Sequence, residues 1–131
     1  MPYSINADTD YVRIILAGQL TVVEVVSAAA ELDKIDAGPG PTLHRLVDIT
    51  AVENLHVSFS EMSGFSSQRR HVKLKNLVRT AVVAKTPVQF GVGRMFEFMN
   101  AQPETQVAVF KDVDGAERWL RGEAEIKPSM I

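Results

Sequence analysis

The sequence contains no cysteine. Disulfide bonds, thiolate metal sites and thiol catalysis are therefore excluded, and this composition suits a reducing compartment. No apolar run approaches the roughly 20 residues that a membrane-spanning helix needs. The first residues, Met1-Pro2-Tyr3-Ser4, show no basic region followed by an apolar one, so we expect no signal peptide. These absences predict a cytoplasmic protein without integral membrane association.

A strong bias of charge is also missing. The chain has 14 basic and 16 acidic residues, and its formal net charge of -2 provides no overall attraction to nucleic acid. One basic run without an acidic residue comprises Arg69, Arg70, His71, Lys73, Lys75 and Arg79. Such a run could form a surface for an anionic partner, but the dipole at the C-terminal end of a helix also stabilises cations. Because the run has no aromatic residue, we favour the second interpretation and expect no nucleic-acid partner.

The composition that remains is that of a globular domain. Of 131 residues, 46% are hydrophobic and 23% are charged, which is close to the average for folded proteins and sufficient for a core. We find no internal repeat. We therefore expect one domain over residues 1–122, followed by a flexible C-terminal tail over residues 123–131.

The stretch His44–Thr50 is the centre of the predicted fold. Its middle, Leu46-Val47-Asp48-Ile49, is mostly apolar with two β-branched residues. This pattern is typical of a strand that is buried on both faces in a largely parallel sheet. Asp48 would then lie near the carboxyl end of a central strand, which is where open α/β sheets tend to build their sites.

Strand and helix patterns alternate through the rest of the chain. Further strands are expected at residues 3–6, 11–17, 78–84 and 105–110. Capping-box spacings and a proline in a first turn predict helices that begin at Thr21, Ser58, Thr86 and Asp114. The order β-β-α-β-α-β-α-β-α predicts an α/β fold with a mixed, mostly parallel five-stranded sheet and four helices.

The order of these elements, with the residues that separate them, resembles the STAS superfamily and specifically its SpoIIAA-like family (STAS/SEC14-type domain). The matching segments span residues 3–120 and are Gly18-Gln19-Leu20-Thr21, Arg45-Leu46-Val47-Asp48-Ile49-Thr50, Thr80-Ala81-Val82-Val83-Ala84, Phe90-Gly91-Val92-Gly93-Arg94-Met95-Phe96, Val109-Phe110 and Ala116-Glu117-Arg118-Trp119-Leu120. The resemblance implies a STAS-like domain without catalytic activity. Relatives of this kind regulate other proteins by contact, or hold apolar ligands between helices and sheet.

The chain departs from one motif of that superfamily. Anti-sigma antagonists of the STAS class carry an acidic-Ser-Ser-Gly-like motif after the central strand, and residues 48–58 contain no such motif. The resemblance therefore implies the scaffold without this phosphorylation switch. Ser58 and Ser60 are still candidate phosphorylation sites, because a helix dipole favours a negative charge at its N-terminus. A capping role explains Ser58 equally well.

A ligand site is one interpretation of the apolar residues on the second and third predicted helices. The candidate ligand-binding residues are Asp48, Phe59, Met62, Phe65, Met95 and Met99. Flexible methionines and aromatic rings suit an adaptable pocket between these helices and the sheet. The alternative is that the apolar residues form ordinary core. For Asp48 the alternative is that the carboxylate bonds backbone amides of the following loop.

An interaction surface is predicted on the third helix. Phe90 projects almost opposite the apolar stripe at 100° per residue, and Phe98 lies on its flank, so Phe90, Arg94 and Phe98 form the candidate surface. The alternative for Phe90 is a ring folded over neighbouring side chains. Gly91 flanks the stripe, and we expect it to allow close approach of this helix to the sheet.

The sequence offers little for catalysis. The three histidines have no metal-binding spacing, and no serine lies in a Gly-x-Ser-x-Gly motif, so we expect neither metal nor cofactor. A hydrolase would have to assemble Asp48, His56 and Ser60 in space. We predict instead a non-enzymatic protein-interaction or regulatory module that forms a homodimer or binds another protein. The alternative is a carrier of a small apolar, lipid-like ligand.

Overall fold

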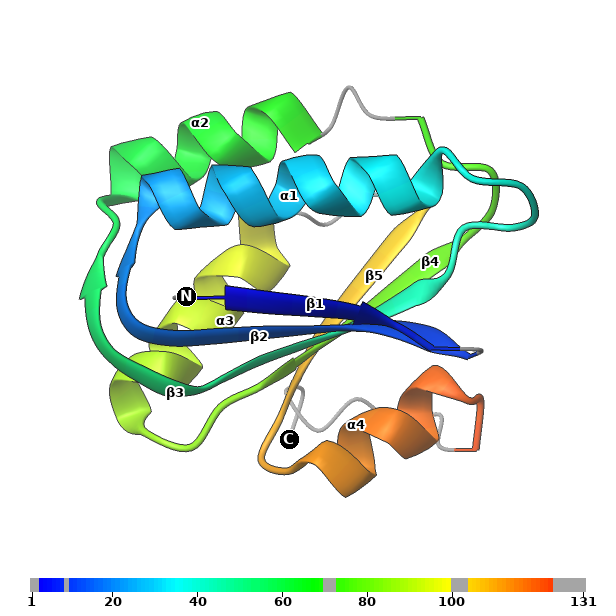
Figure 1. Ribbon diagram of the computed structural model, residues 1–131. Helices are drawn as coiled ribbons and strands as arrows, with labels where there is room; N and C mark the ends of the chain where they lie inside the picture. The colour runs from blue at the N-terminus through cyan, green and yellow to red at the C-terminus, as the bar shows by residue number, and fades with distance from the viewer. Residues whose placement is uncertain (1–2, 9, 70–72, 100–103, 124–131) are drawn as a thin grey trace.

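A five-stranded sheet organises the protein (Figure 1). The computed structural model describes residues 3–8, 10–69, 73–99 and 104–123. The strands lie side by side in chain order as β1 (Tyr3–Ala7), β2 (Tyr11–Thr21), β3 (His44–His56), β4 (Val78–Val83) and β5 (Thr105–Phe110). β1 is antiparallel to β2, and the other neighbouring pairs are parallel. The helices are α1 (Val22–Asp36), α2 (Phe59–Arg69), α3 (Pro87–Met99) and α4 (Val113–Leu120). The predicted fold class and element order are confirmed.

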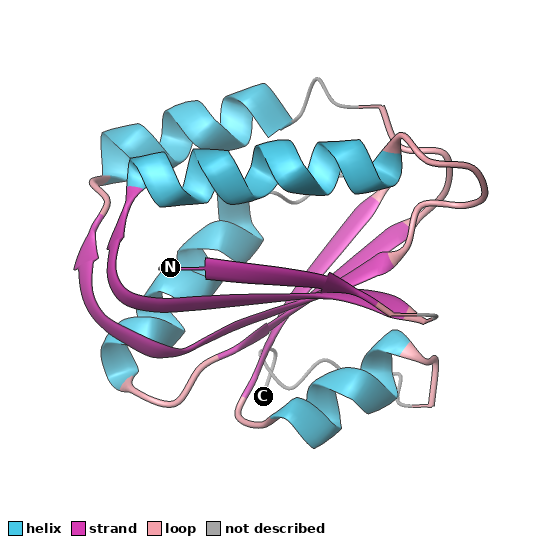
Figure 2. Ribbon diagram, viewed as in Figure 1, coloured by secondary structure: helices cyan, strands magenta, loops and turns pink. Residues whose placement is uncertain are grey.

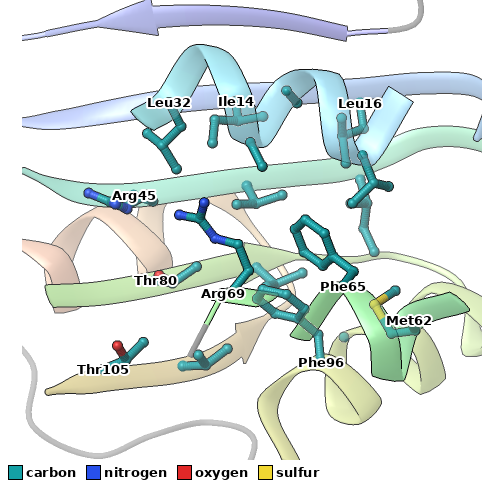
Figure 3. Close-up of a pocket in the computed structure, with 18 of the residues that line it drawn as sticks. Ile14, Leu16, Leu32, Arg45, Met62, Phe65, Arg69, Thr80, Phe96 and Thr105 are labelled. Atoms are coloured by element: carbon teal, nitrogen blue, oxygen red, sulfur yellow. The ribbon is translucent and has the colours of Figure 1, made fainter. Parts of the chain in front are cut away.

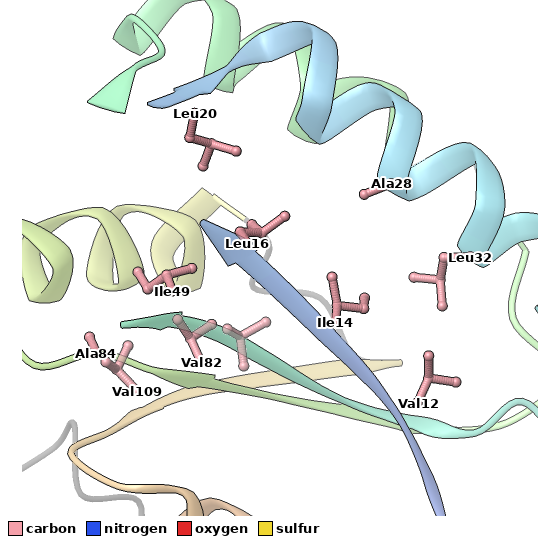
Figure 4. Packing of buried hydrophobic residues seen from close by; sticks show 11 residues of the cluster. Val12, Ile14, Leu16, Leu20, Ala28, Leu32, Ile49, Val82, Ala84 and Val109 are labelled. Atoms are coloured by element: carbon pink, nitrogen blue, oxygen red, sulfur yellow. The ribbon is translucent and has the colours of Figure 1, made fainter. Parts of the chain in front are cut away.

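The helices divide between the two faces of the sheet (Figure 2). On one face, α1, α2 and α3 cover an apolar cluster whose strand residues include Val12, Ile14 and Leu16 (Figure 4). On the other face, α4 packs against a second cluster that includes Leu46 and Trp119. Successive strand residues point to opposite faces, so β2 and β3 supply both clusters. This two-sided burial explains why the run around Leu46 is almost continuously apolar.

β2 and β3 are longer than the sequence predicts. β2 was expected to end before Gly18, and β3 at Thr50, but they continue to Thr21 and His56. The register of their pairing shifts on both sides of Gly18, whose positive φ of 69° suits glycine. In Figure 1 the ends of both strands curve away from the rest of the sheet toward α1 and α2. The bulge therefore bends the strands where a simple stop was predicted.

The helix starts follow the predicted caps with one exception. Thr21 donates its backbone N–H to the Glu24 carboxylate at 3.0 Å. Ser58 and Glu61 exchange two such hydrogen bonds, at 2.9 and 3.1 Å. Thr86 Oγ1 accepts from the backbone N–H of Gln89 at 3.1 Å. These contacts satisfy amides of the first turn that have no partner within the helix.

The exception is α4, for which the predicted cap at Asp114 is wrong. The N-cap is Asp112, whose carboxylate accepts from the backbone N–H of Gly115 at 2.7 Å. The Glu117 carboxylate accepts the Tyr11 hydroxyl of β2. Burial and this hydrogen bond raise the pKa of Tyr11 to about 12. The helix therefore begins at a local cap two residues before the predicted one.

Close approach of α3 to the sheet occurs at Gly93, so the expectation for Gly91 is wrong. A Cβ atom on Gly93 would lie 3.0 Å from a methyl group of Val109 on β5. A Cβ atom on Gly91 would meet nothing within 4 Å. Gly93 therefore has the packing reason that the sequence analysis assigned two positions too early.

His44 joins β3 to β4 through its side chain and gives the fold a pH-sensitive contact. Its Nδ1 accepts the backbone N–H of Arg79 at 2.9 Å. Burial, followed by the charges of Arg79 and Arg45, lowers the pKa of His44 below its ordinary value of 6.5. The neutral ring is therefore the form that the folded state prefers, whereas the unfolded chain takes up a proton near pH 6.5.

We expect the free energy of unfolding to fall as pH drops through about 6.5, because the unfolded state then binds more protons than the folded state. The contribution of this partly exposed ring should stay below about 1 kcal/mol. Urea unfolding at pH 7.5 and 5.0 measures it, with His44→Asn keeping an acceptor but losing the titration. His44→Asn should show a flatter pH dependence than the wild type, and His56→Asn should not. Equal slopes for all three proteins would contradict the assignment.

Candidate functional site: an apolar cavity between the helices and the sheet

A cavity of about 180 Å³ lies between the sheet and the helices α1, α2 and α3. Its wall is mostly apolar and includes Ile14, Leu16, Leu32, Val47, Met62, Phe65, Val82 and Phe96. Figure 3 shows several of these side chains converging from strands and helices. The few polar residues in the wall are Arg45, Arg69, Thr80, Glu104 and Thr105.

Small residues leave this space open. Ala28 and Ala29 of α1 line the cavity where larger side chains would fill it. The strand residues opposite them are of ordinary size and belong to the apolar cluster of that face. Because side chains in protein interiors normally pack without voids larger than a water molecule, a cavity of this size is a distinct feature of the fold.

Two arginines in the wall of the cavity form ion pairs with acidic residues in the C-terminal part of α1. Arg45 of β3 is buried, and its two terminal nitrogens donate to the Asp36 carboxylate at 3.1 and 2.5 Å. Burial lowers the pKa of Arg45, and the opposing effect of Asp36 is smaller. Arg69 of α2 donates to Asp33 at 2.7 Å. In Figure 3 the Arg69 guanidinium lies between Arg45 and Phe65.

The structure brings together only part of the predicted ligand site. Met62 and Phe65 line the cavity. Phe59 does not, because its side chain is 69% exposed, and Met95 is half-buried outside the wall. The side chain of Met99 lies outside the described residues.

Asp48 does not face the cavity. It alternates along β3 with Val47, which lines the cavity, and therefore points to the α4 face. Its carboxylate accepts the backbone N–H and the hydroxyl of Thr50 at 2.9 and 2.6 Å, and Arg13 lies 3.9 Å away. The carboxylate does bond a backbone amide, as the alternative interpretation expected, but that amide belongs to Thr50 within β3 and not to a following loop.

Sequence reasoning missed the two arginines and α1. The sequence predicts a pocket between the second and third helices and the sheet, whereas α1 also supplies much of the wall. Arg45 carried a usable signal, because it is a charged residue that precedes a buried strand run.

Arg69 is predicted only as part of the basic run. Where that run is described, Arg69 and Lys75 bind groups of the same chain, with Lys75 donating to the carbonyls of Gly38 and Gly40 at 2.6 and 2.9 Å. Arg70 and His71 lie outside the described residues.

The predicted interaction surface on α3 is only partly exposed. Phe90 is half-buried and packs against the apolar cluster of the α1 face, so its expected exposure is wrong. The folded ring that was its alternative is correct. Phe98 is 84% exposed and Arg94 is exposed, so their role in an interaction stays a prediction.

A second group of exposed apolar residues lies at the beginning of α1 and α2. Val23 is 68% exposed, Val26 is 46% exposed, and Phe59 is 69% exposed. Thr21 and His56 pair in the sheet just before the two helices, so their first turns begin next to one another. Figure 1 shows α1 and α2 side by side. We call these three residues the α1–α2 apolar surface.

The residues of the hypothetical hydrolase do not meet. Asp48 and His56 lie eight positions apart on one strand, which separates them by roughly 20 Å or more. The Asp48 carboxylate binds Thr50, and Ser60 is exposed. Within residues 3–8, 10–69, 73–99 and 104–123 there is also no cluster of three or more His, Cys, Asp or Glu residues that could hold a metal ion. In the same residues no helix is long and apolar enough to cross a membrane.

Comparison with known proteins gives the fold. No protein-family model matches the chain, and no curated protein matches its sequence. A solved structure of an uncharacterized protein from the DUF3478 family of Shewanella loihica, described as having a SpoIIAA-like fold, covers 90% of this chain and 91% of its own. The TM-score of that match is 0.59, with 24% identity. The chain has a SpoIIAA-like fold. The resemblance drawn from the sequence is confirmed at this level.

A second solved structure that matches the fold carries a stated role. An anti-sigma factor antagonist from Mycobacterium paratuberculosis covers 91% of this chain and 92% of its own, with a TM-score of 0.61 and 15% identity. At such identities the likeness shows the fold alone. What this SpoIIAA-like domain does must therefore be argued from its own residues.

Proposed function

We propose that this SpoIIAA-like domain is a non-enzymatic interaction module that binds another protein through the α1–α2 apolar surface. The observation that carries the proposal is the exposure of Val23, Val26 and Phe59 on neighbouring helix ends. Large apolar side chains that stay exposed on neighbouring elements often mark sites of protein contact. The anti-sigma factor antagonist that shares the fold supports a regulatory role.

Ser58 and Ser60 are neighbours of Phe59 in the chain, and their phosphorylation would regulate binding at this surface. Ser58 caps α2 through its contacts with Glu61, whereas the exposed Ser60 follows Phe59 directly. A phosphate on Ser60 would add negative charge within the first turn of α2, next to Phe59 of the α1–α2 apolar surface. Phosphorylation of Ser60 would then change partner binding without disturbing the cap.

Self-association is the first kind of protein binding to test, because in a two-fold dimer the α1–α2 apolar surface of one protomer packs against the same surface of the other. We expect the wild type to form dimers at micromolar concentration. The variant Val23→Ser/Phe59→Ser should dissociate them with a Kd raised at least roughly 30-fold, as for central apolar contacts of interfaces. Sedimentation equilibrium measures both. The matched control is Phe98→Ser, an even more exposed aromatic position on α3.

The control also separates the two candidate surfaces. Loss of dimers in Phe98→Ser but not in the α1–α2 variant would move the interface to α3 and contradict our assignment. A wild type that stays monomeric at several hundred micromolar would contradict self-association. Unchanged far-ultraviolet circular dichroism of each variant shows that any loss arises at the surface.

A second candidate function, the carrying of a small apolar ligand, is favoured by the cavity. Its volume of about 180 Å³ exceeds what packing defects leave in an ordinary core. The ligand would lie against α1, α2 and α3 rather than between α2 and α3 alone.

A further inference from the structure

We propose that the cavity binds one small amphipathic carboxylate, with its apolar part against α1 and the sheet and its carboxylate on Arg69. The inference rests on the second candidate function and names the chemical class of its ligand. It is independent of the α1–α2 apolar surface.

The size of the cavity limits the apolar part. An engineered cavity of about 150 Å³ in another protein holds a benzene molecule. The present volume of about 180 Å³ is slightly larger and has an almost wholly apolar wall. It fits one ring or a short acyl chain of about eight carbons. A two-chain lipid is far too large for it.

Arg69 offers the head-group site. Its guanidinium lines the cavity, and its side chain is 18% exposed. Of its five N–H donors, the structure records one in a hydrogen bond to the described residues, which is the 2.7 Å contact from Nη1 to Asp33. The remaining donors form the planar fork that binds a carboxylate through two parallel hydrogen bonds. A ligand carboxylate would therefore share Arg69 with Asp33.

Arg45 is not available for the same role. Both of its terminal nitrogens are held by Asp36, and Nη1 also donates to the carbonyl of Leu43. The pair fixes the end of the cavity and leaves its charge neutralised. Glu104 is the one acidic residue among the described residues of the wall, and it is exposed, so water screens its repulsion of an anion.

Isothermal titration calorimetry with octanoate tests the inference. The full chain is first freed of bound apolar molecules on a hydrophobic resin. The neutral ligand of equal chain length is 1-octanol. We expect a Kd for octanoate of the order of 0.1 mM. Arg69→Gln should weaken octanoate binding at least roughly tenfold, since it removes a charge-assisted contact. Octanol binding should change less than about twofold. The control Arg118→Gln, an exposed arginine of α4 on the other face, should change neither.

Methyl NMR locates the ligand without a variant. Octanoate should shift the signals of Leu16, Leu32 and Val82, which line the cavity, and leave those of Leu46 and Val83 on the α4 face unmoved. Binding of octanol without octanoate would overturn the inference while leaving an apolar carrier. Absence of binding by either ligand would overturn the carrier as well. Shifts confined to the α4 face, or equal weakening of both ligands by Arg69→Gln, would also overturn the inference.

Discussion

Replacing Trp119 by alanine is expected to lower the free energy of unfolding by about 4 kcal/mol, close to the whole stability of a small domain. Trp119 is 1% exposed and joins α4 to the sheet. Its ring centroid lies 5.4 Å from that of Phe110, and the Arg79 guanidinium carbon lies 5.2 Å from it. Arg79 also donates to the Trp119 carbonyl at 2.7 Å. Truncation leaves a large cavity and removes most of the apolar contact that holds α4.

Urea unfolding at pH 7.5 measures this effect. Trp119→Phe should lose about half as much, because a ring remains. Phe98→Ala is the matched control for loss of an aromatic ring, and at 84% exposure it should change the free energy of unfolding by less than about 0.5 kcal/mol. A loss below about 1.5 kcal/mol for Trp119→Ala would contradict the assigned role of α4.

Replacing Arg45 by methionine is expected to lower the free energy of unfolding by about 3 kcal/mol. The substitution keeps much of the side-chain volume but leaves the Asp36 carboxylate, whose side chain is only 12% exposed, without its partner. An unpaired charge in that position loses its hydration without compensation. Chemical denaturation of the variant gives the loss directly.

The double variant Arg45→Met/Asp36→Leu supplies the control for this interpretation. Removing both charges should restore most of the stability, since an apolar pair of similar volume often replaces a buried ion pair without loss. Arg121→Met removes an exposed arginine that lies 3.9 Å from Asp10, and should cost less than about 1 kcal/mol. If the double variant were as unstable as Arg45→Met, the loss would come from packing and not from the stranded carboxylate.

The two predicted losses concern opposite faces of one sheet. Trp119 closes the α4 face, while the Arg45–Asp36 pair closes one end of the cavity on the α1 face. The loss of either contact should also destabilise the opposite face of the sheet, because β3 contributes residues to both faces. The ligand titration should therefore be done with variants such as Arg69→Gln that spare these contacts.

The sequence determined the order of the elements and the class of the fold. The apolar run around Leu46 predicts a strand that is buried on both faces. A strand covered on one face alternates apolar and polar residues, whereas a strand covered on both faces is continuously apolar. Ser58 and Glu61 predicted the start of α2, because a capping box is formed within four residues. Such local signals require no knowledge of distant neighbours.

The tertiary structure decided how the elements meet. Gly18 ends no strand, because the pairing partner of β2 continues and the glycine forms a bulge within the ladder. Phe90 is half-buried because it packs against the apolar cluster formed by side chains of distant strands. The cavity depends on small residues of α1, such as Ala28, lying over the strand residues of the same sheet face. No local pattern specifies which small residues share a space, since that depends on the distance and angle between whole elements.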